Sequence, residues 1–161
     1  MNNKVVYVMF RNWLDGNRDM HIMKSMDGGL TFNVPQKLGT GNWKLNGCPM
    51  DGGDIQIDKA DQPVTIWRRE GKLYSTTGTG NETQLADGKN GSVIPANNGN
   101  IYTWTDKGIV IVQTADGKKF NLGEGSLPLI TKLKNGTMLC TWQKEHTIMG
   151  SFINATLESL L

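Results

Sequence analysis

Three stretches of the chain align on a tryptophan: PVTIWRRE (residues 63–70), NIYTWTDK (100–107) and TMLCTWQKE (137–145). The tryptophans lie 37 and 38 residues apart, and VVYVMFRN (5–12) repeats the pattern with Phe10 in the tryptophan's place. Each stretch is apolar, β-branched or aromatic and ends in polar residues, which is typical of a buried strand leaving a core. The sequence therefore predicts a repeated all-β unit.

Further short strands are expected around each tryptophan stretch. They lie at residues 54–58, 92–95 and 127–133 before it, at 20–24, 72–76, 108–113 and 147–152 after it, and at 32–37 and 119–122 as a fourth strand. Four strands about every 40 residues form the blade of a β-propeller, and we name them A to D from the axis outward.

The number of blades expected from the sequence is too small to close a propeller. We expect complete blades at 54–86 and 92–122, and partial blades at 4–38 and 127–161, all in one segment over 1–161. The tail at 153–161 is either an outer strand or a frayed end. Since two complete and two partial blades do not close a ring, either two chains associate or the chain is a piece of a longer protein. A β-trefoil is the alternative fold, because three repeats of about 40 residues fill a chain of this length.

Composition excludes several classes of partner. The net charge is +2 and the basic residues are scattered, which argues against nucleic acid, since phosphate binding needs a concentrated basic surface. No apolar run approaches the ~18 residues of a membrane span. The first residues do not form a signal peptide, so localisation stays open and a parent protein could be exported.

The two cysteines, Cys48 and Cys140, are either one disulfide or two free thiols, and two buried free thiols are the simpler expectation. No Cys/His cluster has the spacing of a zinc site. We expect no metal and no cofactor.

One motif is specific. SMDGGLTF (residues 25–32) fits the Asp-box pattern of Ser, any residue, Asp, any residue, Gly, any residue, Thr and an aromatic, with Ser25, Asp27, Gly29, Thr31 and Phe32 at the specified positions. The carboxylate can accept backbone N–H groups within a tight C-to-D turn, and glycine supplies positive φ. The aromatic ring would pack where the chain re-enters the sheet. The motif therefore predicts a structural turn.

A shorter copy, TADGKKF (114–120), occupies the same place in the third unit. With two boxes at matching positions, the sequence resembles the Asp-box (BNR-repeat) sialidase-like β-propeller superfamily over essentially the whole chain. FRN (10–12), NGCPMDG (46–52) and WRRE (67–70) also look like the C-terminal half of bacterial sialidase-like proteins. The resemblance implies an exo-acting glycoside hydrolase for sialic acid or another acidic sugar, and an Asp-box on the face opposite its active site.

Arginine placement points to the same ligand. All four arginines fall on or beside expected B-to-C loops: Arg11, Arg18, Arg68 and Arg69. B-to-C and D-to-A loops share one face of a propeller, and guanidinium binds a carboxylate with two hydrogen bonds. Members of the family hold the sugar carboxylate with clustered arginines, so the resemblance implies substrate binding here. Alternatively, Arg18 pairs with Asp15 or Asp19, and Arg69 with Glu70, to fasten the loops.

The same face holds the candidates for catalysis. The long loop at 39–53 contributes Trp43, which either stacks on a sugar or packs over a neighbouring blade. Asp19, Asp51 and Glu70 are the candidate acid–base groups, because glycoside hydrolysis usually needs two carboxyl groups. Sialidases use a tyrosine nucleophile, and no tyrosine here stands in a matching context. A non-catalytic carbohydrate-binding module, or an inactive half-propeller that self-associates, is therefore the alternative function.

Overall fold

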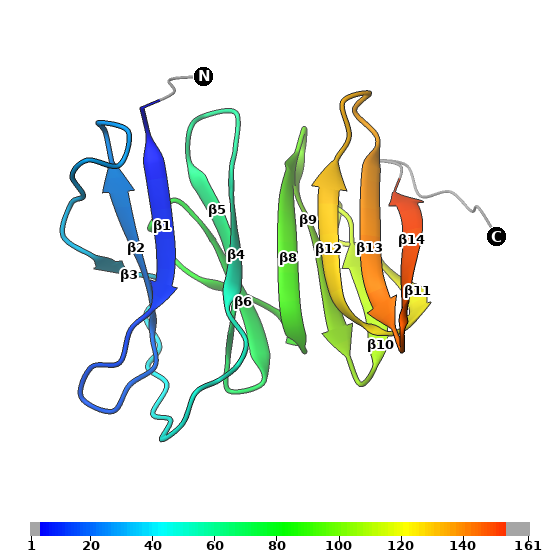
Figure 1. The fold of residues 1–161 in the computed structure, drawn as a ribbon, viewed down its shortest axis with the longest axis horizontal. Helices are drawn as coiled ribbons and strands as arrows, with labels where there is room; N and C mark the ends of the chain where they lie inside the picture. Colours follow the sequence, from blue (N-terminus) through cyan, green and yellow to red (C-terminus); the bar gives the residue numbers. More distant parts are fainter. Residues whose placement is uncertain (1–3, 154–161) are drawn as a thin grey trace.

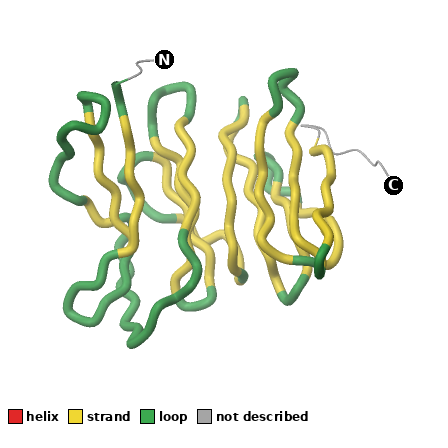
Figure 2. The backbone as a smooth tube through the Cα atoms, viewed as in Figure 1, coloured by secondary structure: helices red, strands yellow, loops and turns green. Residues whose placement is uncertain are grey.

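The computed structural model describes residues 4–153, and its regular structure over that range is entirely β-strand (Figures 1 and 2). The strands are β1 (Val6–Arg11), β2 (Met20–Ser25), β3 (Gln36–Lys37), β4 (Gly53–Ile57), β5 (Pro63–Arg69), β6 (Lys72–Thr77), β7 (Thr83–Asp87), β8 (Lys89–Ala96), β9 (Gly99–Asp106), β10 (Ile109–Gln113), β11 (Lys119–Glu124), β12 (Ser126–Lys132), β13 (Met138–Lys144) and β14 (Thr147–Ile153). Residues 4–153 contain no helix with the length and apolar character that a membrane span needs.

The strands form four separate antiparallel sheets, in the orders β1-β2-β3, β4-β5-β6-β7, β8-β9-β10-β11 and β12-β13-β14. We call them sheets 1 to 4. The first strands of sheets 2, 3 and 4 lie side by side, with β8 between β4 and β12 (Figure 1). Sheets ordered in this way are the blades of an incomplete β-propeller.

The β-trefoil alternative is wrong. Over residues 4–153 the strands make four open sheets and no closed barrel, whereas a trefoil requires strands from all three repeats to share one. Sheet 1 begins with the expected B strand, β1, and sheet 4 ends with the expected C strand, β14. An outer strand at residues 154–161 lies outside the described residues.

The core lies between successive sheets. One apolar cluster joins sheet 1 to sheet 2 through Met20, Ile22, Leu38 and Trp67, and two similar clusters join sheet 2 to sheet 3 and sheet 3 to sheet 4. An inner sheet is therefore covered on both faces. This explains why residues 63–67 of β5 are all buried and why the tryptophan stretches read as continuous apolar runs.

Two-residue turns close the tightest B-to-C hairpins. Glu70 and Gly71 have φ values of 52° and 80°, and Lys107 and Gly108 have 47° and 82°. Positive φ at both positions is the requirement of a type I′ turn, which matches the twist of the strands that it joins.

Two expectations from the sequence need correction. The strand expected at residues 32–37 contains only Gln36–Lys37, because the Asp-box turn takes up the preceding chain and Pro35 has no N–H to donate. The cysteines are free thiols, but only Cys140 is buried while Cys48 is exposed on the long loop.

Candidate functional site

Two long connections of the molecule emerge at the same edge, at the bottom of Figure 1. Residues 12–19 join β1 to β2, and residues 38–52 join β3 to β4. The backbone N–H of Arg18 donates to the carbonyl of Trp43 at 2.8 Å, and the N–H of Trp43 donates to Asp19 Oδ1 at 2.9 Å. The two connections therefore form one structure, which we call the loop projection.

Arg11 supports the loop projection from within. Its guanidinium donates to the main-chain oxygens of Arg18 at 2.7 Å, Arg68 at 2.9 Å and Asp51 at 3.4 Å. It also lies 5.2 Å from the ring centre of Trp43, whose side chain is only 8% exposed. Burial lowers the pKa of Arg11, against nearby carboxylates that raise it. Both terminal nitrogens of Arg11 donate to carbonyls, while its buried Nε has no hydrogen-bond partner among the described residues. Trp43 packs inside, so this indole face is not open for a sugar to stack on.

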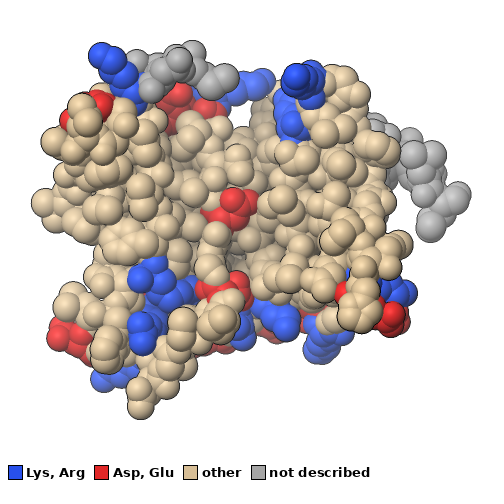
Figure 3. Space-filling model, in the orientation of Figure 1, with Lys and Arg blue, Asp and Glu red and all other residues tan. Residues whose placement is uncertain are grey.

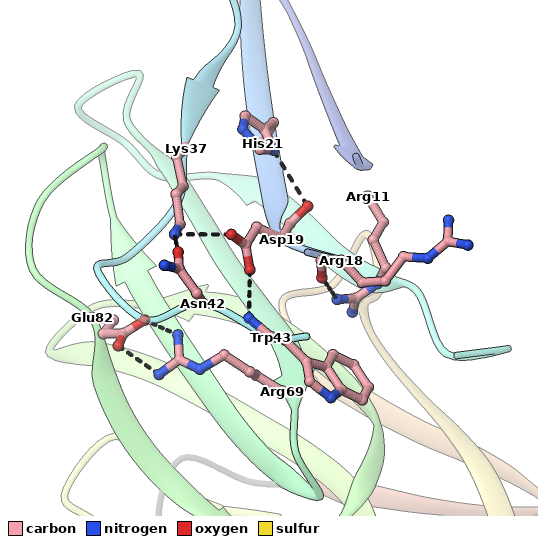
Figure 4. A network of polar contacts seen from close by, with 9 residues as sticks. All are labelled: Arg11, Arg18, Asp19, His21, Lys37, Asn42, Trp43, Arg69 and Glu82. Atoms are coloured by element: carbon pink, nitrogen blue, oxygen red, sulfur yellow. Dashed lines mark hydrogen bonds and ion pairs between the residues drawn. The ribbon is translucent and has the colours of Figure 1, made fainter. Parts of the chain in front are cut away.

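Arg69 is also held by contacts within the protein, and its carboxylate partner is Glu82 and not the expected Glu70. It makes two hydrogen bonds of 2.7 Å to Glu82, and not to Glu70, and its guanidinium stacks 3.9 Å from the ring centre of Tyr74 (Figure 4). These hydrogen bonds raise the pKa of Arg69 and lower the pKa of Glu82. The space that Arg69 bounds with Arg11, Arg18 and neighbouring side chains has no room for a water molecule, so these three arginines do not form a ligand cavity there.

Arg18 lies against an aromatic residue that the sequence reasoning did not single out. Its guanidinium is 4.8 Å from the ring centre of Trp13, whose side chain is 62% exposed. Arg18 does not pair with Asp15 or Asp19; Asp19 pairs with Lys37 at 2.9 Å instead. The signal for Trp13 was its place three residues after the aromatic Phe10, in a loop and not in a strand.

A small polar pocket lies on the loop projection (Figure 4). Lys37 bridges Asp19 and the side-chain oxygen of Asn42, and the His21 ring lies 3.3 Å from the Asp19 carbonyl oxygen. The pocket holds about 210 Å³ and is lined by Asn12, Leu14, Asp15, Asn17, Asp19, His21, Lys37 and Asn42. The Asp19 carboxylate and the Lys37 ammonium group of this pocket already pair with each other.

A larger and more open depression lies where the inner strands of sheets 2, 3 and 4 begin. It measures about 400 Å³ and is lined by Met50, Asp51, Gly52, Gly53, Asp54, Asn90, Gly91, Ser92, Leu127, Pro128 and Leu129. We call it the axial depression. The N–H of Asn90 donates to Asp51 Oδ2 at 3.3 Å, and Arg68 lies 3.7 Å from the same oxygen with 31% of its side chain exposed. Burial raises the pKa of Asp51, opposed by that hydrogen bond and by Arg68.

The three candidate catalytic residues lie in three different places. Asp51 lines the axial depression, Asp19 lines the polar pocket, and Glu70 is an exposed turn residue between β5 and β6. A second carboxylate of the axial depression, Asp54, accepts hydrogen bonds from the Ser92 hydroxyl at 2.8 Å and the Val93 N–H at 2.9 Å. That carboxylate joins β4 to β8. The structure therefore does not bring the predicted acid–base groups together.

The Asp-box turn lies at the opposite edge, after β2 (Figure 1). Asp27 accepts the Thr31 hydroxyl at 2.6 Å, the Thr31 N–H at 2.9 Å and the Ser25 hydroxyl at 2.7 Å, and the Gly29 N–H donates to Ser25 Oγ at 2.8 Å. These hydrogen bonds lower the pKa of Asp27 to about 2. Phe32 remains 39% exposed and precedes β3, so it does not pack into the sheet as expected.

The shorter box repeats part of this pattern. The Thr114 hydroxyl donates to Asp116, and hydrogen bonds from Thr114 and Lys118 lower the pKa of that carboxylate. Within residues 4–153, no group of three or more His, Cys, Asp or Glu side chains is placed to bind a metal ion.

The fold and the loop edge define a β-propeller segment with candidate ligand sites at one face. No protein-family model matches the chain, and no curated protein sequence does. Among solved structures the chain is similar to one described as a streptogramin B lyase structure, at a TM-score of 0.44 and 12% sequence identity. The similarity covers 91% of this chain and 58% of that chain, so this chain spans less than two thirds of its length.

Proposed function

We propose that the chain is a glycan-recognition module that takes an acidic sugar in the axial depression. The observation that supports the proposal is that this depression lies where the first strands of three sheets converge. Asp51 lines it, and the partly exposed Arg68 lies 3.7 Å from that carboxylate. Ligand sites favour concave mouths with a few converging polar groups.

Arg68 is the arginine best suited to meet a ligand carboxylate. Arg11 and Arg69 are used internally, whereas the ion pair of Arg68 with Asp51 is long, at 3.7 Å. A sugar carboxylate can replace that contact with a bidentate pair. Burial raises the pKa of Asp51, which favours the neutral carboxyl group that such a neighbour requires.

The remaining lining suits the rest of a sugar ring. Leu127 and Leu129 are exposed and offer apolar contact to C–H groups, while Gly52, with open space where a side chain would stand, allows a hydroxyl group to approach the backbone. Trp13, on the loop projection, is an exposed aromatic surface for a further sugar unit.

Recognition is favoured over hydrolysis because a second free carboxyl group is missing from the axial depression. Asp54 is occupied by Ser92 and Val93, and Asp19 and Glu70 lie elsewhere. Hydrolysis remains the second candidate, since Asp51 has the raised pKa that a general acid needs.

The test is calorimetric titration with sialyllactose and with lactose. We expect only sialyllactose to bind, and Arg68→Ala to weaken binding about 10- to 100-fold, as the loss of a charged hydrogen-bonded pair predicts. Arg18→Ala is the matched control, because Arg18 stacks on Trp13 and, unlike Arg68, makes no ion pair with Asp51. Equal weakening by both variants, or equal binding of both sugars, would contradict the proposal. Turnover of a fluorogenic sialoside that Asp51→Asn abolishes would favour hydrolysis instead.

A further inference from the structure

The two ends of the sheet stack each present an uncovered sheet face. We call the face that a sheet turns toward the preceding sheet its leading face, and the face toward the following sheet its trailing face. Inside the chain, the three apolar clusters each join a trailing face to the leading face of the next sheet. The leading face of sheet 1 and the trailing face of sheet 4 have no such partner within residues 4–153.

The leading face of sheet 1 repeats the arrangement that is covered in sheet 2. Trp67 lies opposite Tyr74 on the leading face of sheet 2, and their rings stack at 6.1 Å. In sheet 1, Phe10 lies opposite His21 in the same register, and their rings stack at 5.9 Å. Two residues before Phe10, Val8 is exposed on the same face. The leading face of sheet 1 therefore has a pair of stacked rings in the same register as the leading face of sheet 2, which is buried.

The trailing face of sheet 4 matches the buried trailing faces position by position. The residue that pairs with the position after the tryptophan is Leu73 in sheet 2, Val110 in sheet 3 and Ile148 in sheet 4. Leu73 and Val110 are fully buried at 0% exposure, whereas Ile148 is 72% exposed. Phe152, which pairs with Leu139 on the same face, is 59% exposed.

Neither face carries charge on its central strands. On β13 and β14 the trailing face consists of Leu139, Thr141, Gln143, Ile148, Gly150 and Phe152. Figure 3 views the stack from the side where the first strands of sheets 2, 3 and 4 lie, and there the charged side chains gather along the upper and lower edges. An exposed apolar face of this kind marks an interaction surface.

We propose that the trailing face of sheet 4 packs on the leading face of sheet 1 of a second copy of this chain. A second copy fits because every interface between sheets inside the chain packs a trailing face on a leading face, and a second copy supplies the same pair of faces. In a dimer with a twofold axis this contact forms twice, because sheet 4 of each copy packs on sheet 1 of the other. The two copies then contribute eight sheets. Propellers have 4 to 8 blades, so two copies reach the upper end of that range and three would exceed it.

This assembly is independent of the glycan proposal. It requires only the two end faces, and it leaves the axial depression lined by sheets 2, 3 and 4 of each copy.

Sedimentation velocity of the whole chain over a range of concentrations tests the assembly. We expect a single species of twice the chain mass. Ile148→Lys and Val8→Lys each place a charge on one of the two faces, so each variant alone should raise the dimer dissociation constant at least tenfold. Leu30→Lys is the control, because Leu30 is 85% exposed on the Asp-box turn between β2 and β3 and stands on no strand of either face. Since all three positions are exposed, circular dichroism should show unchanged folding.

The outcomes separate the alternatives. A wild-type monomer at every concentration would overturn the proposal. A dimer that survives Val8→Lys but not Ile148→Lys would show a contact between two copies of sheet 4 and would overturn it too, as would growth into long filaments.

Discussion

The Asp-box turn and the loop projection are both polar segments next to sheet 1, yet they are held in opposite ways. Around Asp27 every side-chain hydrogen bond joins residues at most four positions apart. In the loop projection, the hydrogen bonds of Trp43 to Asp19 and of Arg11 to Asp51 and Arg68 span 24, 40 and 57 positions. A motif with local bonds identifies a turn, whereas a loop with distant bonds depends on the whole stack of sheets.

The difference also changes what the polar residues mean. Arginines at the loop edge resemble a ligand clamp, but two of the four complete the folding of the loops themselves. The arginines in the sequence therefore indicate which face of the molecule carries the long loops. Whether an arginine supports a loop or can bind a ligand depends on its hydrogen-bond partners.

The largest expected effect is that of Arg11→Ala. This change leaves three main-chain oxygens without their charged donor and removes the contact with Trp43. The free energy of unfolding should fall by about 3 kcal/mol, measured by urea denaturation. Arg18→Ala should cost about 1 kcal/mol or less, because Arg18 stacks on an exposed ring. Equal effects of the two variants would remove the distinction between a supporting and a surface arginine.

Glu82→Gln should have an intermediate effect of about 1–2 kcal/mol, since it breaks the bidentate pair with Arg69. The pKa of Glu82 is lowered in the folded state, so its stabilisation is present above the unfolded pKa of about 4.3 and is lost as pH falls through the folded value. Urea denaturation at several pH values should show a smaller loss of stability on acidification in Glu82→Gln than in the wild type.

Asp27→Asn should affect global stability less, because the hydrogen bonds of this carboxylate are confined to one turn. Its folded pKa is about 2, below the unfolded value of about 3.9, so its contribution is complete above pH 4 and disappears toward pH 2. Thermal melts of the variant should lack this part of the acid dependence. Asp116→Asn offers the comparison with the shorter box, and a larger loss in Asp116→Asn would contradict the local account.

The smallest perturbation is thiol labelling, which leaves the fold unchanged. Cys48 on the loop projection is exposed, while Cys140 is buried in sheet 4, where burial raises the pKa of its thiol. A thiol reagent at neutral pH should modify one cysteine rapidly and the second only after denaturant is added. Two fast thiols would show that sheet 4 opens readily.

Much of the fold could be predicted from the sequence because the signals are local. The tryptophan stretches mark second strands, and the Asp-box marks the turn after β2. What could not be predicted depends on contacts between distant residues. Arg69 pairs with Glu82, 13 positions along the chain, and not with its neighbour Glu70, which stands at positive φ in the two-residue turn between β5 and β6. Trp43 is buried because Arg11 and Asp19 hold it from other strands.

The most direct test of a ligand site at the loop edge is a map of backbone NMR shifts during titration with sialyllactose. The account predicts that the signals of Asp51, Asn90 and Leu127 move with a common dissociation constant while those of Asp27 and Thr31 stay in place. Shifts confined to the Asp-box turn, or absent from the axial depression, would contradict it.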